Sequence, residues 1–330
     1  MNRILRTVVL AVAAFALATP AFAQQVVKIA TLAPDGSAWM RELRAAAAEV
    51  QAGTQGRVSV KYYPGGVMGS DTVVLRKMRL GQLQGGVLTS SELAQVYPDA
   101  AVYSLPFLFD DMAQVDRARP VVDPLLAQGF QAKGLQMLAA SDVGFAYVLS
   151  TRALRSRADM TAAKLWIPQN DEIAERTFKM GGVSPILLPL GDVFTSLQTG
   201  LVDTVANTPS GTVALQWHGK LKYMIDLPLS FVVGFVVVDS KAFTKASPAD
   251  QAVMLKAFRA CAQRVDAGIR RDDAAALAAM KKQGLQVLQM DPAETARWKQ
   301  IGARVTQQME AEAHISAPLV AAIRKAAGTR

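Results

Sequence analysis

Residues able to carry out catalysis are few in this chain. Its two histidines, His218 and His314, lie far apart in the sequence and outside any His-x-x-x-His or Gly-x-Ser-x-Gly pattern. Cys261 is the single cysteine, so no intrachain disulfide can form, and we expect it to be a small buried residue of a helix. Carboxylates do not recur at the spacing of metal ligands. We therefore expect no enzyme, no bound metal and no organic cofactor.

Side chains suited to binding follow predicted strands instead. The segment 164–211 is typical of two consecutive strand-to-helix units, with helices opening at Asp171 and Asp192, whose carboxylates are suited to N-capping. The expected strands are 165–167, 183–188 and 202–206. Ligands of open α/β sheets bind at the carboxyl ends of strands, near a switch in strand order. Trp166 and Asn207, each near such an end, are therefore predicted to face a common cleft.

This segment resembles part of a known family, the substrate-binding proteins of TRAP transporters of the C4-dicarboxylate (DctP) type. The stretch 164–168 (KLWIP) is similar to the family's K-I-R-V-P, and 197–207 (LQTGLVDTVAN) to its L-Q-T-G-x-V-D-G-x-E-N. Further similar stretches, such as Y-P-G-G and L-P-F-L-F, extend the resemblance over most of the chain. The arginine that clamps a substrate carboxylate in most of the family matches Trp166, and a second ligand arginine matches Ala146. The resemblance thus implies a subgroup without these two carboxylate contacts.

The resemblance also implies a pocket between two lobes. An aromatic wall is expected there, because an indole offers an apolar face and a single N–H donor in place of a guanidinium fork. The predicted ligand-binding residues are Trp166, Asn207, Phe145, Tyr147, Trp39, Asp71 and Ser91. Two alternatives stay open. In the first, Trp166 packs in the core of the second lobe and does not contact the ligand. In the second, the hydroxyls of Ser90 and Ser91 cap a helix that begins at Glu92 and do not contact the ligand.

The N-terminus predicts export. Residues 1–23 have the pattern of a secretory signal: Arg3 and Arg6, an apolar run over 7–18, and Ala21-Phe22-Ala23 as a cleavage site. The apolar run is shorter than the roughly 20 residues of a spanning helix, so a periplasmic protein without membrane insertion is expected. The formal net charge is +9, but the basic residues are scattered and lack interleaved aromatics, which argues against nucleic-acid binding.

Strands that alternate with helices predict an α/β fold like that of periplasmic binding proteins, with two lobes around a hinge and cleft and long C-terminal helices. We expect lobe I at 24–145 plus 234–275, lobe II at 146–233 plus 276–330, and a separate sheet in each. Gly234 interrupts the apolar strand 230–239 and is suited to a hinge. A helix from Ser247 through Met280 reaches ~50 Å, enough to cross both lobes.

The function implied by the resemblance is a solute receptor. Such a protein binds a small organic acid between its lobes and delivers it to the membrane permease subunits of a TRAP transporter, and we expect it to be a monomer. The alternative from another class is a periplasmic ligand-sensing subunit of a signalling receptor with the same fold. An exported enzyme is the third and weakest alternative.

Overall fold

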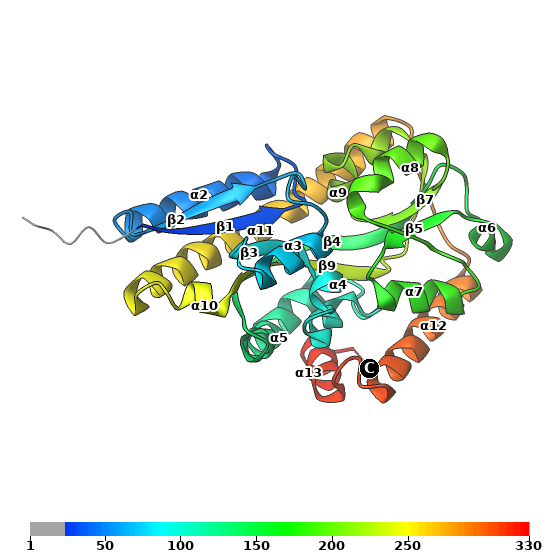
Figure 1. Cartoon of the computed structure of the whole chain (residues 1–330). Coiled ribbons are helices and arrows are strands. Elements are labelled where there is room, and N and C mark those ends of the chain that lie inside the picture. Colours follow the sequence, from blue (N-terminus) through cyan, green and yellow to red (C-terminus); the bar gives the residue numbers. More distant parts are fainter. Residues whose placement is uncertain (1–23, 330) are drawn as a thin grey trace, which may run out of the picture.

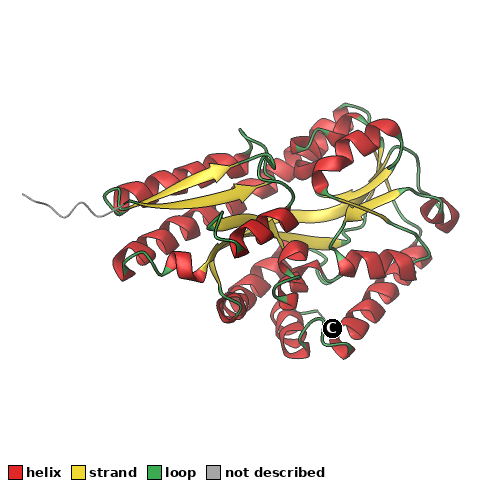
Figure 2. Ribbon diagram, in the orientation of Figure 1, coloured by secondary structure: helices red, strands yellow, loops and turns green. Residues whose placement is uncertain are grey.

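The computed structural model describes residues 24–329, so the predicted signal peptide lies outside the described residues. Two α/β halves lie side by side and share long central strands (Figure 1). Figure 2 shows these strands crossing the middle of the molecule, with helices on either side. Within residues 24–329, none of the helices has the length and apolar character needed to cross a membrane.

The first half-sheet has the strand order β2-β1-β3-β9-β4. Its strands are β1 (Gln25–Thr31), β2 (Val58–Tyr63), β3 (Gly85–Thr89), β4 (Leu135–Ser150) and β9 (Ser230–Asp239). β1 is parallel to both β2 and β3. β9 runs antiparallel to β3 and β4 and occupies the stretch expected from its continuous apolar sequence.

The second half-sheet continues from β4 in the order β4-β7-β5-β6, with β8 and β10 attached at the side. Its strands are β5 (Leu165–Pro168), β6 (Ile186–Leu188), β7 (Thr204–Asn207), β8 (Tyr223–Ile225) and β10 (Gln286–Leu288). β5 is parallel to β6 and β7, as expected of successive strand-to-helix units. β6 is shorter than predicted and begins directly after Pro185, which cannot donate a backbone hydrogen bond.

The expectation of a separate sheet in each lobe is wrong, because β4 belongs to both half-sheets. Its first part, through Ala146, pairs with β9, and its last part, from Tyr147, pairs with β7. At 16 residues it spans ~50 Å, which is long enough to serve both halves. Register shifts follow Met137 and Asp142, and such irregularities bend a strand. The bend lets one strand continue while the halves remain distinct.

The helices cover both half-sheets. They are α2 (Ala38–Gly53), α3 (Asp71–Arg79), α4 (Ser90–Leu93), α5 (Met112–Ala132), α6 (Arg157–Thr161), α7 (Glu172–Met180), α8 (Val193–Thr199), α9 (Pro209–Ala214), α10 (Ser240–Phe243), α11 (Pro248–Lys282), α12 (Pro292–Ala311) and α13 (Ala317–Ala327), with short 3₁₀ turns at η1 (Pro98–Ser104), η2 (Leu190–Asp192) and η3 (Trp217–Gly219). α11 has 35 residues and packs against α2, β4 and α9, so the prediction of a helix crossing both halves is confirmed.

Two predicted N-caps have different outcomes. The Asp171 carboxylate accepts a hydrogen bond from the Ala174 N–H and caps α7 as expected. Asp192 makes no capping bond to α8. It ends the turn η2 with a helical backbone, φ −91° and ψ −10°, whereas a capping side chain needs an extended backbone to reach back to the helix.

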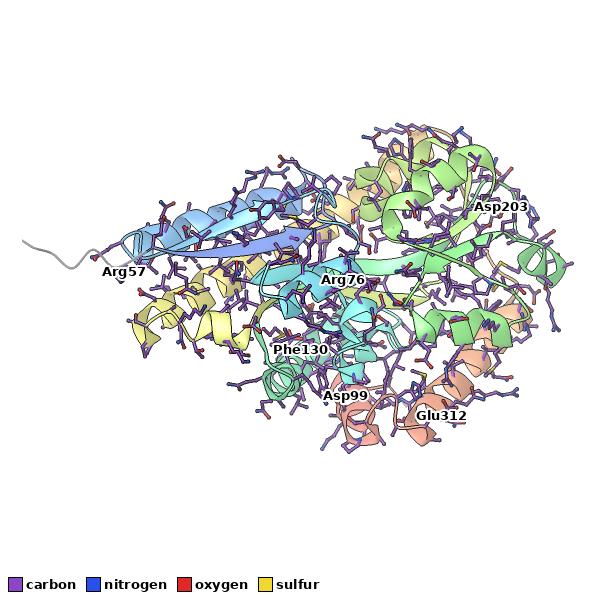
Figure 3. All side chains as sticks on the ribbon, in the orientation of Figure 1. Arg57, Arg76, Asp99, Phe130, Asp203 and Glu312 are labelled. Carbon is purple, nitrogen blue, oxygen red and sulfur yellow. The ribbon has the colours of Figure 1, made fainter. Side chains whose placement is uncertain are left out.

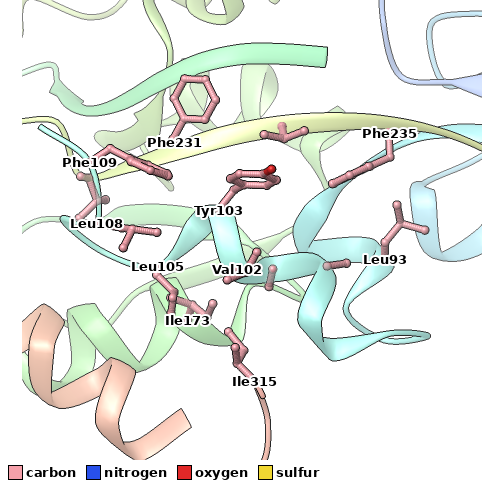
Figure 4. Close-up of a cluster of buried hydrophobic side chains, with 14 of the residues drawn as sticks. Leu93, Val102, Tyr103, Leu105, Leu108, Phe109, Ile173, Phe231, Phe235 and Ile315 are labelled. Atoms are coloured by element: carbon pink, nitrogen blue, oxygen red, sulfur yellow. The ribbon is translucent and has the colours of Figure 1, made fainter. Parts of the chain in front are cut away.

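The aromatic segment before α5 packs in the main hydrophobic core (Figure 4). The rings of Tyr103 and Phe109 stack at 6.4 Å between centroids, and Phe109 meets Phe231 edge-on at 6.1 Å. The side chains of Tyr103 and Phe109 are almost fully buried. The L-P-F-L-F stretch therefore joins η1 to β9 through core packing. Cys261 of α11 is also buried, as expected, and burial raises the pKa of its thiol to about 12.

The C-terminal helices contact both halves. α12 packs against α7, and α13 packs against α5 and η1. The Ser316 hydroxyl donates to the Asp99 carboxylate at 2.8 Å, and Arg176 of α7 pairs with Glu312 at 2.7 Å. Asp99 and Glu312 mark these two attachments in Figure 3. The end of the chain therefore bridges the first half-sheet's helices and α7.

Candidate functional site

A cavity of about 180 Å³ lies between the two halves, and we call it the central cavity. The first half contributes the end of β1, Trp39, Asp71 and the end of β3, and the second half contributes Leu190 together with α9. Val143 comes from the shared strand β4, and Gly234 comes from β9 beside it. A larger open space of about 520 Å³ adjoins it, shares four lining residues with it, and is called the outer cleft. Such a position between two lobes is where ligand sites commonly form.

Asp71 is a buried acid in the wall of this cavity. It begins α3, its side chain is 4% exposed, and its Oδ1 atom has no hydrogen-bond partner. Burial first, and the Glu92 carboxylate second, raise the pKa of Asp71 to about 7, against a smaller lowering by the Thr89 N–H. An unpaired buried carboxyl is unfavourable unless a ligand or a proton satisfies it. Asp71 is therefore a candidate ligand contact.

Trp39 lines the same cavity from α2, directly over Gly234 of β9. A Cβ atom at Gly234 would lie 2.9 Å from Cη2 of the Trp39 ring. Only glycine permits an approach this close. Gly234, which we expected at a hinge, thus also makes room for the Trp39 ring in the cavity wall.

Asn207 ends β7 beside the cavity. Its Oδ1 accepts the Thr208 N–H at 2.9 Å, which leaves its Nδ2 as a buried donor without a partner. The amide lies behind Gly211, which lines the central cavity: a Cβ at Gly211 would be 2.9 Å from Oδ1 and 3.3 Å from Nδ2 of Asn207. Because the backbone N–H fixes which end of the amide is oxygen, the free atom is a donor.

Trp166 packs inside the second half. Its side chain is 2% exposed, its Nε1–H donates to the Leu188 carbonyl at 3.0 Å, and its ring meets Trp217 edge-on at 5.3 Å. It is absent from the residues that line the central cavity and the outer cleft. This placement corresponds to the packing alternative, and contact between Trp166 and a ligand stays a prediction.

The other predicted residues are not gathered in one place. Phe145 and Tyr147 line a different cavity of about 270 Å³, together with Asp273 and Leu277 of α11. Phe145 also meets Phe231 edge-on at 5.1 Å. The structure brings Trp39 and Asp71 together at the central cavity, with Asn207 behind its wall, and leaves the predicted aromatic wall divided among three locations.

Ser91 is buried at the start of α4 and does not line the central cavity itself, although its neighbour Thr89 does. Its hydroxyl is 3.2 Å from that of Thr89, and Ser90 is 2.9 Å from Ser104. Helix α4 begins at Ser90, and its N-cap, Thr89, makes no side-chain capping bond. The alternative in which these serines cap a helix from Glu92 is therefore wrong, because the helix already includes them.

Sequence analysis missed a group of polar residues that joins the two halves. The Asn170 Nδ2 donates to both Glu92 carboxylate oxygens, at 3.1 and 3.0 Å, and lies 2.9 Å from the Thr72 hydroxyl. Gln169 also reaches Thr72, at 3.3 Å. Glu92 is 7% exposed, and burial raises the pKa of its carboxyl. The only available signal was the position of Gln169 and Asn170 directly after a strand end.

Comparison with known proteins decides the family. The family model described as bacterial extracellular solute-binding protein, family 7, matches residues 29–313. The chain belongs to this family. Among its relatives, the C4-dicarboxylate-binding periplasmic protein DctP of Rhodobacter capsulatus is 28% identical over 340 residues, which is 98% of each chain. The 2,3-diketo-L-gulonate-binding periplasmic protein YiaO of Escherichia coli is 24% identical over 72% of this chain and 73% of its own.

Solved structures of similar proteins have the same fold as this solute-binding protein. A TRAP periplasmic solute binding protein from Desulfovibrio salexigens, with bound orotic acid, superposes with a TM-score of 0.85 at 20% identity, covering 92% of this chain and 99% of that one. The sugar acid binding protein DctPAm from Advenella mimigardefordensis, with galactonate, gives 0.85 at 22% identity over 92% and 98%. The predicted two-lobed α/β architecture is confirmed.

Another cavity of this solute-binding protein, about 630 Å³, lies between α5, β4 and α11. Arg119 in its wall pairs with three acids: Asp123 at 3.0 Å, Asp142 at 2.5 Å and Asp266 at 2.9 Å. Arg119 also donates to the Ala140 carbonyl beside the irregular part of β4. These contacts fix the bend of the shared strand. Among residues 24–329, no group of three or more His, Cys, Asp or Glu is placed to hold a metal.

Proposed function

We propose that this protein is the extracytoplasmic solute receptor of a TRAP-type secondary transporter, which binds a small organic acid and delivers it to membrane permease subunits. The family supports this, as do relatives named for binding C4-dicarboxylates, 2,3-diketo-L-gulonate and sialic acid. The observation that carries the proposal is the central cavity, which is lined from both halves and lies between them.

Delivery requires that the ligand change the shape of the receptor. A ligand held between two lobes shifts the open-to-closed equilibrium only by its greater affinity for the closed form. We propose lobe I at 24–145 plus 234–275 and lobe II at 146–233 plus 276–330, joined at the shared strands. Gly144, with φ 120°, pairs with Val232, and Gly234 pairs with Ser141. Each of the two crossing strands therefore has a glycine, and the two are offset by two positions along β9. Rotation there opens and closes the cavity.

The proposal includes a periplasmic monomer that is processed by removal of residues 1–23 and has no catalytic activity. Thermal shift of the purified protein against a library of organic acids tests the binding function. Organic acids should raise the unfolding temperature and be recovered unchanged, and small-angle X-ray scattering should show a smaller radius of gyration with the bound acid. Stabilisation by sugars or simple cations alone would exclude the acid class, and turnover of a bound compound would establish an enzyme.

A further inference from the structure

The walls of the central cavity are apolar apart from Asp71 and a few hydroxyls. The large side chains that line it are Leu32, Trp39, Leu88, Leu190 and Leu215. Among the described residues that line the central cavity and the outer cleft, none is Lys, Arg or His, whereas Asp71 and Asp192 are both present. A ligand whose only polar group is a carboxylate would meet no opposite charge here. The cavity favours a ligand with an apolar body and a group that satisfies a carboxylate.

A second acid, Glu92, lies near Asp71. Glu92 lies close enough to affect the ionisation of Asp71, and its own oxygens are occupied by Asn170, Thr72 and Gln95. The Oδ1 atom of Asp71 therefore stays the free acceptor of this group. A ligand cation that donates to Oδ1 relieves both the missing hydrogen bond and the repulsion between the two acids. An ammonium group meets both needs.

The second unpaired atom is a hydrogen-bond donor. Asn207 has committed its oxygen to the Thr208 N–H, and its Nδ2 donor is buried without a partner. It lies 3.3 Å from where a Cβ on Gly211 would stand, and Gly211 lines the central cavity. A buried donor without a partner is unfavourable, so the cavity also favours a ligand acceptor on this side. A carboxylate is such an acceptor.

We infer that the ligand is an amino-carboxylic acid with an apolar body, whose ammonium group binds Asp71 from the first half and whose carboxylate accepts from Asn207 of the second half. This inference rests on the proposed function and narrows its substrate class. The aliphatic or aromatic part then lies against Trp39, Leu190 and Leu215. A zwitterion of this kind contacts both halves at once, which is what closure requires.

Three probes with the same carbon chain test the assignment: norleucine, hexanoate and hexylamine. Isothermal titration at pH 8 keeps Asp71, with its pKa of about 7, mostly ionised. We expect norleucine to bind at least tenfold more tightly than either of the others. Asp71→Asn should weaken norleucine at least tenfold and leave hexanoate unchanged, and Asn207→Ala should weaken norleucine and hexanoate alike. Asp272→Asn removes the same charge from an exposed site on α11 and should change nothing.

A protonated Asp71 that donates to a plain carboxylate is the competing arrangement. In that case hexanoate binds as tightly as norleucine and more tightly at pH 5 than at pH 8, which overturns the inference and leaves the proposed function intact. A thermal-shift panel of the proteinogenic amino acids and their deaminated acids covers other body shapes. Stabilisation by the deaminated acids alone again overturns the inference. If neither set nor the organic-acid library stabilises the protein, the proposed function fails as well.

Discussion

The side chain of Asn170 bridges both carboxylate oxygens of Glu92, at 3.1 and 3.0 Å, and so ties the loop after β5 to α4 on the opposite half of the molecule. The two residues are 78 positions apart in the chain. Because the two residues belong to opposite halves, their contact holds the halves together in the arrangement seen in this structure. Its removal should favour the open form.

Asn170→Ala is therefore expected to weaken ligand binding without unfolding either half. Hydrogen bonds to a charged group contribute about 1.5–3 kcal/mol, so a loss of roughly tenfold to a hundredfold in affinity is expected. Titration calorimetry measures the affinity, and scattering should show a larger radius of gyration. Gln289→Ala is the matched control, since it removes an amide-to-carboxylate bond, to Asp226, that lies within the second half. Equal effects of the two variants would contradict a role in closure.

Asp71 should make stability depend on pH. Its pKa is about 7 in the folded protein and about 4 in an unfolded chain, so between these values the folded form keeps a proton that the unfolded form has lost. The free energy of unfolding therefore falls as pH rises from about 4 to 7, by on the order of 2–4 kcal/mol from this group.

Denaturation of the ligand-free protein at pH 5 and pH 8 checks this dependence. Other buried carboxyls titrate in the same range, so the quantity to compare is the difference between the native protein and Asp71→Asn. As pH rises, the free energy of unfolding of Asp71→Asn should increase relative to that of the native protein. If both proteins lose the same free energy between the two pH values, Asp71 is not the group responsible.

The variant Trp166→Ala tests whether the indole packs in the core of the second half or stacks on a ligand. Packing against Trp217 and the bond to Leu188 predict a loss of about 3–5 kcal/mol in the free energy of unfolding. Stacking on a ligand predicts instead a loss of ~1–3 kcal/mol in ligand affinity with stability retained. Trp217→Ala is the control, because Trp217 shares the packing contact and lies outside the predicted ligand residues. Similar behaviour of both variants would assign Trp166 to the core.

Much of the fold was predictable because it depends on local patterns. The continuous apolar run 230–239 became β9 at its predicted limits, and a proline-containing cap at Ser247 opened α11 where expected. The sheet boundary was not predictable in this way. Whether β4 serves one half-sheet or two depends on its partners, and no local pattern shows that a strand changes partners after Ala146.

The candidate site was only partly predictable for similar reasons. All three apolar residues of β5 are buried, so both faces of that strand are covered, and position near the strand end does not tell core from cavity at Trp166. For Phe145 and Tyr147, the irregularity after Asp142 determines which way alternate side chains face. Trp39 was predicted as part of an aromatic wall and Asp71 as a polar contact from the opposite lobe, and the structure places both in the lining of the central cavity.

Gly234→Ala should disturb the cavity more than the fold. The added methyl group would lie 2.9 Å from the Trp39 ring, which must shift within the wall of the central cavity. We expect ligand affinity to fall at least tenfold, whereas overpacking of this kind lowers the free energy of unfolding by about 1–3 kcal/mol. Gly268→Ala is the control, because a methyl group there meets no atom within 4 Å and helix propensity favours alanine by up to ~1 kcal/mol. Titration and thermal denaturation of both variants measure the two quantities. Unchanged ligand affinity in Gly234→Ala would show that Trp39 does not shape the binding site.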